Sequence, residues 1–287
     1  MSRNRSRRRR SGAKHPASEW LSLLPIVPLL LLLTAGVGYT AAQAMSTEGA
    51  FQAAFGLPGI GRTMLFSLAV AAGSASVSVA LGTVLAYLLW RLPAVYRRWG
   101  SALALPLILP HVVVGFLTLV WFGQSGLVSA AFERIGLHGV YRSPLFRGDG
   151  VGIVLAYVYK SAPFVLFLVL PVLRRIDPAY LQTARMLGAG ELRSFASVLL
   201  PRLVPAAGAA WIILFVYSFG AYDLPFMVGE SSPRMISLYL YRIYFARPIS
   251  ERPTAAALLF VVFLVGVVMV VAYTRAASGT EERERRL

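Results

Sequence analysis

The stretch LQTARMLGAGELRSFASVLLPRL, residues 181–203, is polar and amphipathic, yet it lies between two strongly apolar segments of the chain. Asp177 and Pro178 precede it and are typical of a helix start, because Asp can cap the first turn and Pro fits the first helical position. Gly188 and Gly190 favour a left-handed stop to that helix. The stretch therefore predicts a short helix that ends at a glycine corner.

A second short helix is expected after the corner. Glu191 suits its first turn, where a carboxylate meets the positive end of the helix dipole, and we expect the helix to end near Pro201. Such a protruding pair of helices needs a cover for its apolar side, either the lipid surface or a partner protein with an apolar, acid-rimmed groove. The apolar side consists of Leu181, Ala184 and Leu187, and the positive charge comes from Arg185, Arg193 and Arg202.

The composition indicates that the rest of the chain lies in a membrane. Hydrophobic residues make up 57% of the 287 residues, and charged residues only 14%. Apolar runs of about 20 residues recur, which is the length needed to cross a hydrocarbon core of roughly 30 Å. We therefore expect an all-α membrane protein with six transmembrane helices. Their expected positions are about Trp20–Ala42, Thr63–Trp90, Ala102–Phe122, Val151–Leu173, Val204–Pro225 and Thr254–Tyr273.

Several kinds of chemistry are excluded by the residues that the chain lacks. It has no cysteine, which excludes disulfides, thiolate catalysis and cysteine-based metal sites. His15, His111 and His138 are widely separated, so no metal site is predicted, and no cofactor is expected. A P-loop requires Gly-x-x-x-x-Gly-Lys followed by Ser or Thr, and neither Lys14 nor Lys160 completes it. We therefore expect no enzyme activity from this chain, and any ATP hydrolysis requires a separate subunit.

The distribution of basic residues predicts the orientation in the membrane. A net charge of +16 suggests nucleic-acid binding in a soluble protein, but in a membrane protein it reflects the charge of the loops. With the N-terminus inside, 19 of the 28 Lys and Arg residues fall on the inner side and 8 on the outer side. We therefore expect a multi-pass protein of the bacterial inner membrane, with both termini cytoplasmic and no nucleic-acid partner.

Two interpretations of the N-terminus are open. A basic start, an apolar run and Ala42-Gln43-Ala44 resemble a signal peptide with its cleavage site. We favour an uncleaved first helix, because the apolar run is longer than the usual 7–15 residues of such peptides. The expected organisation is a basic cytoplasmic tail over residues 1–19, which lies against anionic membrane lipid, a transmembrane domain over 20–275 and a cytoplasmic tail over 276–287.

Small residues and prolines predict how the spans pack. Ser74, Ser78 and Gly82 are spaced four apart and form one small face on the second span, which favours close helix packing over a polar pore lining. Pro106 and Pro110 lie in the third span, where each removes a backbone donor and predicts a kink.

A few polar residues within the spans are candidates for a solute path. Lys160 lies inside the fourth span, where a charge is costly and suggests a function, although the side chain could also extend outward to water. Asp223 near the outer end of the fifth span could pair with Lys160 if the two helices are adjacent, or could meet a cationic substrate. Tyr157, Tyr217 and Tyr222 could line a gate or act as interfacial anchors.

The polar stretch also carries a motif. The permease subunits of binding-protein-dependent ATP-binding cassette importers, of the MetI-like fold, have a cytoplasmic motif written E-A-A, three residues, G, nine residues, I-x-L-P. This chain reads QTA at 182–184, then Gly188, then VLLP at 198–201, with the same spacing throughout. It resembles that family, and it departs from the motif by Gln for Glu, Thr for Ala and Val for Ile.

Two further stretches resemble the same family. LPLILPHVVVG, residues 105–115, is similar to its proline-rich third-span signature, with His111 where a second proline is common. SFGAYDLPFMVG, residues 218–229, is similar to the end of its fifth helix, especially in the polyamine, iron, thiamine and phosphonate-type branches. The likeness covers about residues 62–273, and a polyamine is the substrate that it favours.

The resemblance implies a role and partners. The segment of about residues 177–201 would be a cytoplasmic coupling helix, between the fourth and fifth spans, that sits in a cleft of an ATP-hydrolysing subunit. The other implied partners are a second permease chain, identical or related, and a periplasmic or lipid-anchored solute-binding protein. Its acidic rims could meet Arg134, Arg142 and Arg147, which are otherwise solvated loop charges. The expected coupling residues are Gln182, Thr183, Ala184, Arg185, Gly188, Leu200 and Pro201.

Two other function classes compete with this interpretation. Gly123-Gln124-Ser125-Gly126 fits the nucleophile motif of rhomboid proteases, but no histidine follows His138 to serve as the base, which favours a turn. A secondary transporter or channel that works without ATP is the other alternative. One buried lysine, no acidic relay and no recognisable inverted repeat argue against it.

Overall fold

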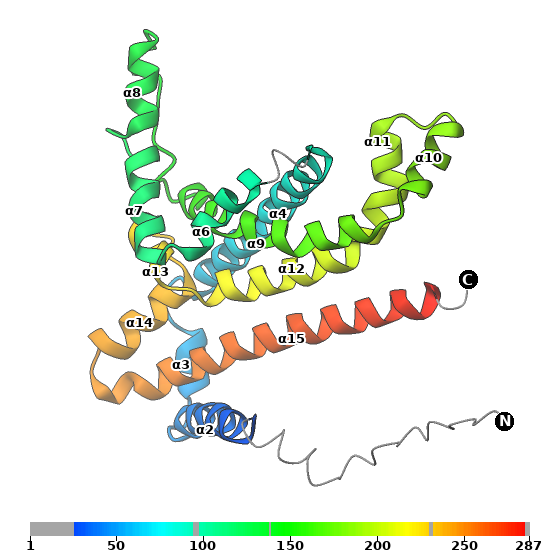
Figure 1. The fold of residues 1–287 in the computed structure, drawn as a ribbon. Helices are drawn as coiled ribbons and strands as arrows, with labels where there is room; N and C mark the ends of the chain where they lie inside the picture. The colour runs from blue at the N-terminus through cyan, green and yellow to red at the C-terminus, as the bar shows by residue number, and fades with distance from the viewer. Residues whose placement is uncertain (1–25, 94–97, 138, 230–231, 285–287) are drawn as a thin grey trace, which may run out of the picture.

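The structure is a bundle of helices (Figure 1). The computed structural model describes residues 26–93, 98–137, 139–229 and 232–284, and these ranges contain helices and loops but no strand. Six helical segments are long and apolar enough to cross a membrane, which confirms the predicted all-α membrane protein. These segments are Ile26–Met45, Ile60–Arg91, His111–Arg134, Val151–Arg175, Glu191–Gly220 and Ile249–Arg275.

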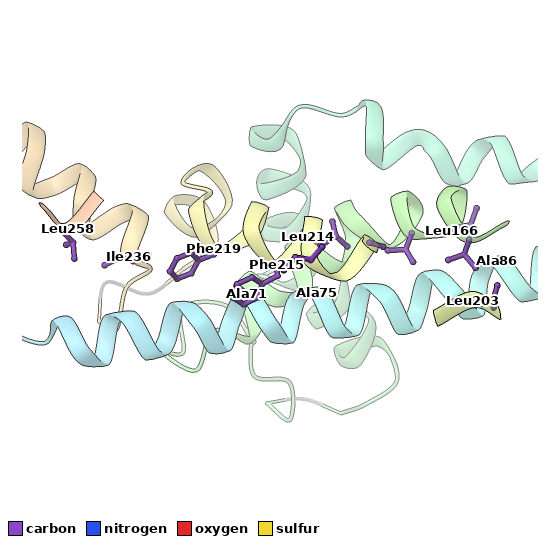
Figure 2. Packing of buried hydrophobic residues seen from close by; sticks show 14 of the residues in the cluster. Ala71, Ala75, Ala86, Leu166, Leu203, Leu214, Phe215, Phe219, Ile236 and Leu258 are labelled. Carbon is purple, nitrogen blue, oxygen red and sulfur yellow. The ribbon is translucent and has the colours of Figure 1, made fainter. Parts of the chain in front are cut away.

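Three long helices form the centre of the bundle: α4 (Ile60–Arg91), α9 (Val151–Arg175) and α12 (Leu200–Gly220). α4 packs along α9 over most of its length and also contacts α12. Figure 2 shows Ala71 and Ala75 of α4 beside the larger apolar side chains of α12. Small residues on one helix thus let bulky residues of its neighbours come close, which is how helices associate in lipid.

The predicted small face of the second span is a packing face. Ser74, Ser78 and Gly82 are all buried on α4. A Cβ atom at Gly82 would lie 2.5 Å from both the carbonyl oxygen of Ala162 and the Cβ of Val165 on α9. Only glycine allows the two backbones to approach this closely.

The first and last spans pack together at the edge of the bundle. α2 (Ile26–Met45) contacts α15 (Arg252–Glu284), and the short α3 (Ala50–Phe55) contacts α15 and α4. Most leucines of α2 are exposed, as expected for a helix surface that meets lipid. The predicted basic tail, residues 1–19, and residues 20–25 of the expected first span lie outside the described part of the chain.

The third span over Ala102–Phe122 was expected to be one helix kinked at Pro106 and Pro110, but it is broken between α6 and α7. The helix stops at Leu109, which is extended with φ −65° and ψ 134°, and α7 starts after Pro110. Proline has no N–H to donate and pushes the preceding residue out of the helical region. The helical pieces are η1 (Arg98–Ala104), α6 (Leu105–Ile108), α7 (His111–Phe122) and α8 (Leu127–Arg134).

The fifth span starts earlier than predicted. A separate short helix was expected to end near Pro201, but α11 (Glu191–Ser194) passes through a π-helical turn, η2 (Phe195–Leu199), directly into α12. In this turn the N–H of Leu200 donates to the carbonyl of Phe195, five residues back. The wider π-helical turn allows the helix to continue at Pro201, which has no N–H.

The two ends of the bundle carry different elements (Figure 1). α10 (Pro178–Met186) and α11 protrude at the end toward which the C-terminal part of α15 runs. α13 (Asp223–Val228) and α14 (Ile236–Ala246) lie at the opposite end, and η3 (Ile249–Glu251) leads from there into α15. The fifth span ends at Gly220, not at the predicted Pro225, which lies within α13.

Candidate coupling surface and solute path

The protruding segment begins with the predicted helix start. Asp177 is the N-cap of α10, and its side-chain oxygen accepts a hydrogen bond of 2.9 Å from the N–H of Ala179. Pro178 occupies the first helical position, where its missing N–H costs nothing. Both signals for the start of this helix are therefore local in the sequence.

Gly188 makes the corner between α10 and α11. Its φ of +81° is left-handed, the N–H of Gly188 donates to Arg185 and that of Ala189 donates to Ala184. This pair of bonds is the Schellman pattern that closes a helix. The prediction was wrong for Gly190, which has φ −66° and is the extended N-cap of α11.

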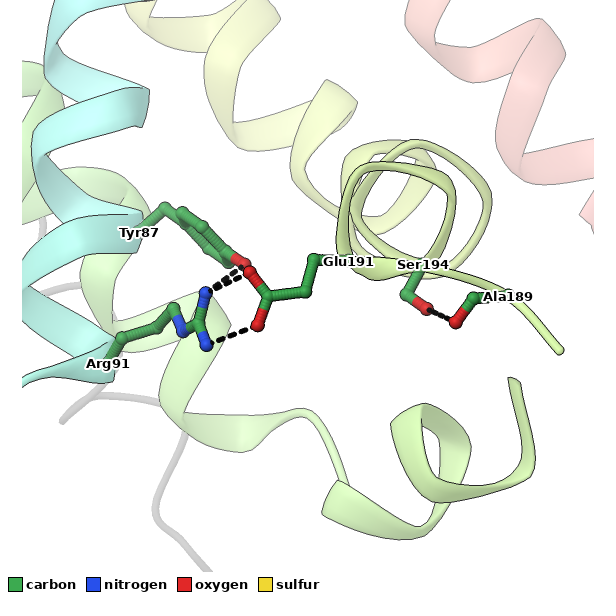
Figure 3. Close-up of polar contacts among 5 residues, drawn as sticks. All are labelled: Tyr87, Arg91, Ala189, Glu191 and Ser194. Atoms are coloured by element: carbon green, nitrogen blue, oxygen red, sulfur yellow. Dashed lines mark hydrogen bonds and ion pairs between the residues drawn. The ribbon is translucent and has the colours of Figure 1, made fainter. Parts of the chain in front are cut away.

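An ion pair ties the protruding segment to the second span (Figure 3). Arg91, in the last turn of α4, donates to both carboxylate oxygens of Glu191, over 2.7 and 2.6 Å. The Tyr87 hydroxyl also accepts a weak bond of 3.4 Å from Arg91, and the Tyr87 ring meets the Phe195 ring at 4.9 Å between centroids. Across the corner, the Ser194 hydroxyl donates to the carbonyl of Ala189 over 3.4 Å.

A second connection joins α10 to the fifth span. The guanidinium of Arg202, in α12, lies 3.9 Å from the centre of the Tyr180 ring in α10, a cation–π contact. α11 needs no such contact, because it continues into α12 through η2. The corner is therefore held to α4 at one side and to α12 at the other.

The tip of the corner exposes large apolar side chains. Met186 is 88% exposed, and Leu187 and Leu192 are each 83% exposed. The predicted apolar side is divided, because Leu181 and Ala184 are half-buried and only Leu187 points outward. We call Met186, Leu187 and Leu192 the apolar tip. The other expected coupling residues Gln182, Thr183, Arg185, Gly188, Leu200 and Pro201 are all exposed.

Lys160 lies inside the bundle and is only 9% exposed. Its ammonium group donates to the carbonyls of Pro106, over 2.9 Å, and of Leu107, over 3.1 Å, and also to that of Leu109. These carbonyls belong to the end of α6, where the break at Pro110 removes their usual helical donors. All three N–H groups of Lys160 are thus engaged with the broken third span.

The other path candidates lie around this point without pairing with Lys160. Both Lys160 and Asp223 are described, and their charged groups do not come within ion-pair distance; Asp223 is exposed in the first turn of α13. Tyr157 is buried, and its hydroxyl lies 3.5 Å from the carbonyl of Ser218. Tyr217 is 36% exposed and its hydroxyl contacts the ring nitrogen Nε2 of His111, a partner that sequence analysis did not predict.

Tyr222 belongs to an aromatic group at the end of the bundle. Its ring lies 5.4 Å from that of Phe226 and 4.8 Å from that of Tyr241, between centroids. Burial, then Tyr241 and the carboxylate of Asp223, raise the pKa of the Tyr222 hydroxyl. Like any tyrosine with an ordinary or raised pKa, Tyr222 is protonated at physiological pH and can offer a hydrogen bond.

The candidate docking arginines, which lie in loops predicted to be on the outer side, are exposed. Arg142 and Arg147 line one hollow of about 570 Å³ together with Gln124, and Arg147 pairs with Asp149 over 3.3 Å. Arg134 ends α8 and does not line this hollow. The protease-like stretch 123–126 forms a turn between α7 and α8, and His138 lies outside the described residues.

Comparison with known proteins shows that most of the chain matches one family model. The model of the family "Binding-protein-dependent transport system inner membrane component" matches residues 78–280. No cluster of three or more His, Asp or Glu side chains suited to a metal occurs in the part of the chain that the structure covers.

Three relatives illustrate the sequence similarity. The molybdenum transport system permease protein ModB of Escherichia coli (strain K12) is 31% identical over 163 residues, 56% of this chain and 68% of that protein. The sulfate transport system permease protein CysT of Salmonella typhimurium is 27% identical, covering 66% of each chain. A probable sulfate transport system permease protein of Chlorella vulgaris is 27% identical, covering 59% of this chain but only 61% of its own length.

Solved structures share the fold. The crystal structure of a bacterial ABC transporter that imports the acidic polysaccharide alginate contains a chain with TM-score 0.75 and 20% identity, covering 91% of this chain and 96% of that one. Inward-facing MetNI, a methionine ABC transporter, has a chain with TM-score 0.53 and 18% identity, covering 76% and 94%.

Proposed function

The chain belongs to the family of binding-protein-dependent transport system inner membrane components, and on this premise we propose that it is the permease subunit of an ATP-driven importer. It forms part of the solute path, and a separate ATP-binding cassette subunit hydrolyses ATP. Without a P-loop, the chain is not that ATPase. Its further partners are a second permease chain, identical or related, and a periplasmic or lipid-anchored solute-binding protein.

The apolar tip is the observation that carries this proposal. Three large apolar side chains are more than four-fifths exposed on a rigid corner that stands clear of the bundle. Water-exposed apolar groups gathered in this way mark a protein interaction site. The corner is held to α4 by the Arg91–Glu191 pair and to α12 by the Tyr180–Arg202 contact. Movement of the apolar tip is therefore transmitted to both the second and the fifth span.

This geometry supports an alternating-access mechanism. When the ATPase subunits close, they move the coupling segment, residues 177–201. The segment continues through η2 without a flexible loop, so α12 moves with it. Lys160 holds the broken end of α6 against α9, and the contact between Tyr217 and His111 joins α12 to α7. Movement of α12 therefore reaches the helices around the proposed path residues Lys160, Tyr217, Tyr222 and Asp223.

We also propose an orientation in the membrane. The coupling segment and the C-terminal part of α15 lie at the same end of the bundle, which supports a cytoplasmic C-terminus.

The relatives described above are named for sulfate and molybdenum, and none of these names supports the polyamine suggested by residues 218–229. We therefore favour a small anion as the solute.

Single-thiol crosslinking tests the coupling role directly. The chain has no cysteine, so Leu187→Cys introduces one thiol at the apolar tip. In native membrane vesicles, a thiol crosslinker at this position should capture a protein that peptide sequencing shows to contain a P-loop. Ile249→Cys, at the other end of the bundle, is the control and should not capture it, although Ile249 is also largely exposed, at 73% against 83% for Leu187. Absence of any P-loop protein at Leu187→Cys would refute the proposal and leave ATP-independent transport as the alternative.

A further inference from the structure

A cavity lined by arginines lies where α4 begins, at the end of the bundle away from the coupling segment. Its volume is about 280 Å³. Its wall combines the first turn of α4, the turn before α14 and α14 itself. The four arginines that line it are Arg62, Arg234, Arg242 and Arg247.

The charge around this cavity is predominantly positive. No Asp or Glu is among the described residues that line it; Glu230 and Ser231, just before Ser232, lie outside the described ranges. Arg247 pairs with Glu251 over 2.6 Å. Arg62 and Arg242 have no carboxylate within ion-pair distance in the described part of the chain. Arg62 and Arg242 would both attract an anion that binds in this cavity.

The start of α4 forms part of the wall of the same cavity. The N-cap of this 32-residue helix is Gly59, which supplies no side-chain acceptor to the first turn. The positive end of the helix dipole therefore lies beside Arg62 without a side-chain cap. The Tyr239 hydroxyl donates to the carbonyl of Pro58 over 3.1 Å and so fixes the wall of α14 against this first turn.

We infer that the cavity is a binding site for a phosphate- or sulfate-like oxyanion group. Arginine forks bind such groups through paired, charge-assisted hydrogen bonds, and a helix N-terminus adds backbone donors. The volume is slightly below the roughly 300 Å³ at which sites for drug-sized molecules begin, which suits a small group. The group belongs either to a free oxyanion or to the headgroup of an anionic phospholipid.

The inference does not rest on transport, because the test measures binding to the purified full-length chain. In a neutral detergent, inorganic sulfate and inorganic phosphate are titrated by calorimetry. In a second arm, the chain is placed in nanodiscs of phosphatidylcholine with a minor fraction of phosphatidylglycerol, and bound lipid is counted by native mass spectrometry. The variants are Arg62→Gln, Arg242→Gln and the double variant, with Arg174→Gln as a control, an exposed arginine on α9 far from the cavity.

Each single variant should weaken binding by about tenfold, the effect of losing one charge-assisted hydrogen bond, and Arg174→Gln should leave it unchanged. Variant-sensitive binding of sulfate or phosphate would identify a free oxyanion as the ligand. Variant-sensitive retention of phosphatidylglycerol, without binding of the free ions, would identify a lipid headgroup. Binding in neither arm, or equal binding by the double variant and Arg174→Gln, would overturn the inference.

Discussion

Arg91 and Glu191 are 100 positions apart in the sequence and form a two-point ion pair that joins the end of α4 to the start of α11. The side chains are 41% (Arg91) and 62% (Glu191) exposed, so water and salt screen their attraction and the pair adds little to stability. The pair instead sets the orientation of the protruding corner relative to the second span, because its two parallel hydrogen bonds fix a direction.

Breaking this pair should uncouple the corner without unfolding the chain. Glu191→Gln removes the charge and one strong acceptor, so we expect normal membrane levels and a normal unfolding temperature, but reduced uptake by membrane vesicles. The double exchange Arg91→Glu with Glu191→Arg restores an ion pair and should recover part of that uptake. If Glu191→Gln transports at the rate of the natural protein, the pair does not transmit movement.

The left-handed corner should depend on Gly188. Gly188→Ala forces a side chain into φ +81°, which costs about 1–2 kcal/mol, although no atom lies within 4 Å of the added Cβ. We expect lower uptake and weaker crosslinking from Leu187→Cys, and Gly188→Arg should abolish uptake while the protein stays in the membrane. Gly190→Ala is the matched control, because Gly190 also has open space but a φ of −66°. Equal uptake by the two Ala variants would show that the corner conformation is not required.

Local signals in the sequence predicted this corner well. Asp177 and Pro178 define the start of α10, and Gly188 its end, because capping and left-handed backbone depend on residues only a few positions apart. The Arg91–Glu191 pair could not be predicted, because it depends on how two distant segments dock. The same limit applies to Pro201, where the sequence predicts a helix end, because continuation through η2 depends on packing against the bundle.

Lys160 shows how far the sequence alone predicts contacts within the transmembrane spans. The sequence identified a buried charge, but its partners are backbone carbonyls of another span, which carry no side-chain signal. These carbonyls accept hydrogen bonds from Lys160 because the helix breaks at Leu109 and Pro110. The sequence predicted a kink at this point, not a helix end with free carbonyls. The Arg62–Arg242 cavity was missed for a similar reason, since its walls come from segments that are far apart in sequence.

Removing the Lys160 ammonium should therefore destabilise the protein. Lys160→Met leaves the carbonyls of Pro106, Leu107 and Leu109 without this donor, at an expected cost of about 3 kcal/mol. The measurement is thermal unfolding of the purified chain without solute. Lys160→Arg keeps the charge and several donors and should lose less. A residue that only contacted solute would change the KM of uptake and leave the unfolding temperature as it was.

The contact between α4 and α9 at Gly82 should tolerate little added volume. Gly82→Ala puts a methyl group 2.5 Å from both the Ala162 carbonyl oxygen and the Val165 Cβ, and backbone atoms cannot move aside as a flexible side chain would. We expect the free energy of unfolding to fall by about 1–3 kcal/mol, measured by thermal or denaturant unfolding in detergent. Gly73→Ala, on the same helix, meets only the Val154 side chain at 3.9 Å and should be neutral. Because both variants add the same methyl group to α4, a loss confined to Gly82 isolates the close approach of the two helices, and equal stability of the two variants would contradict it.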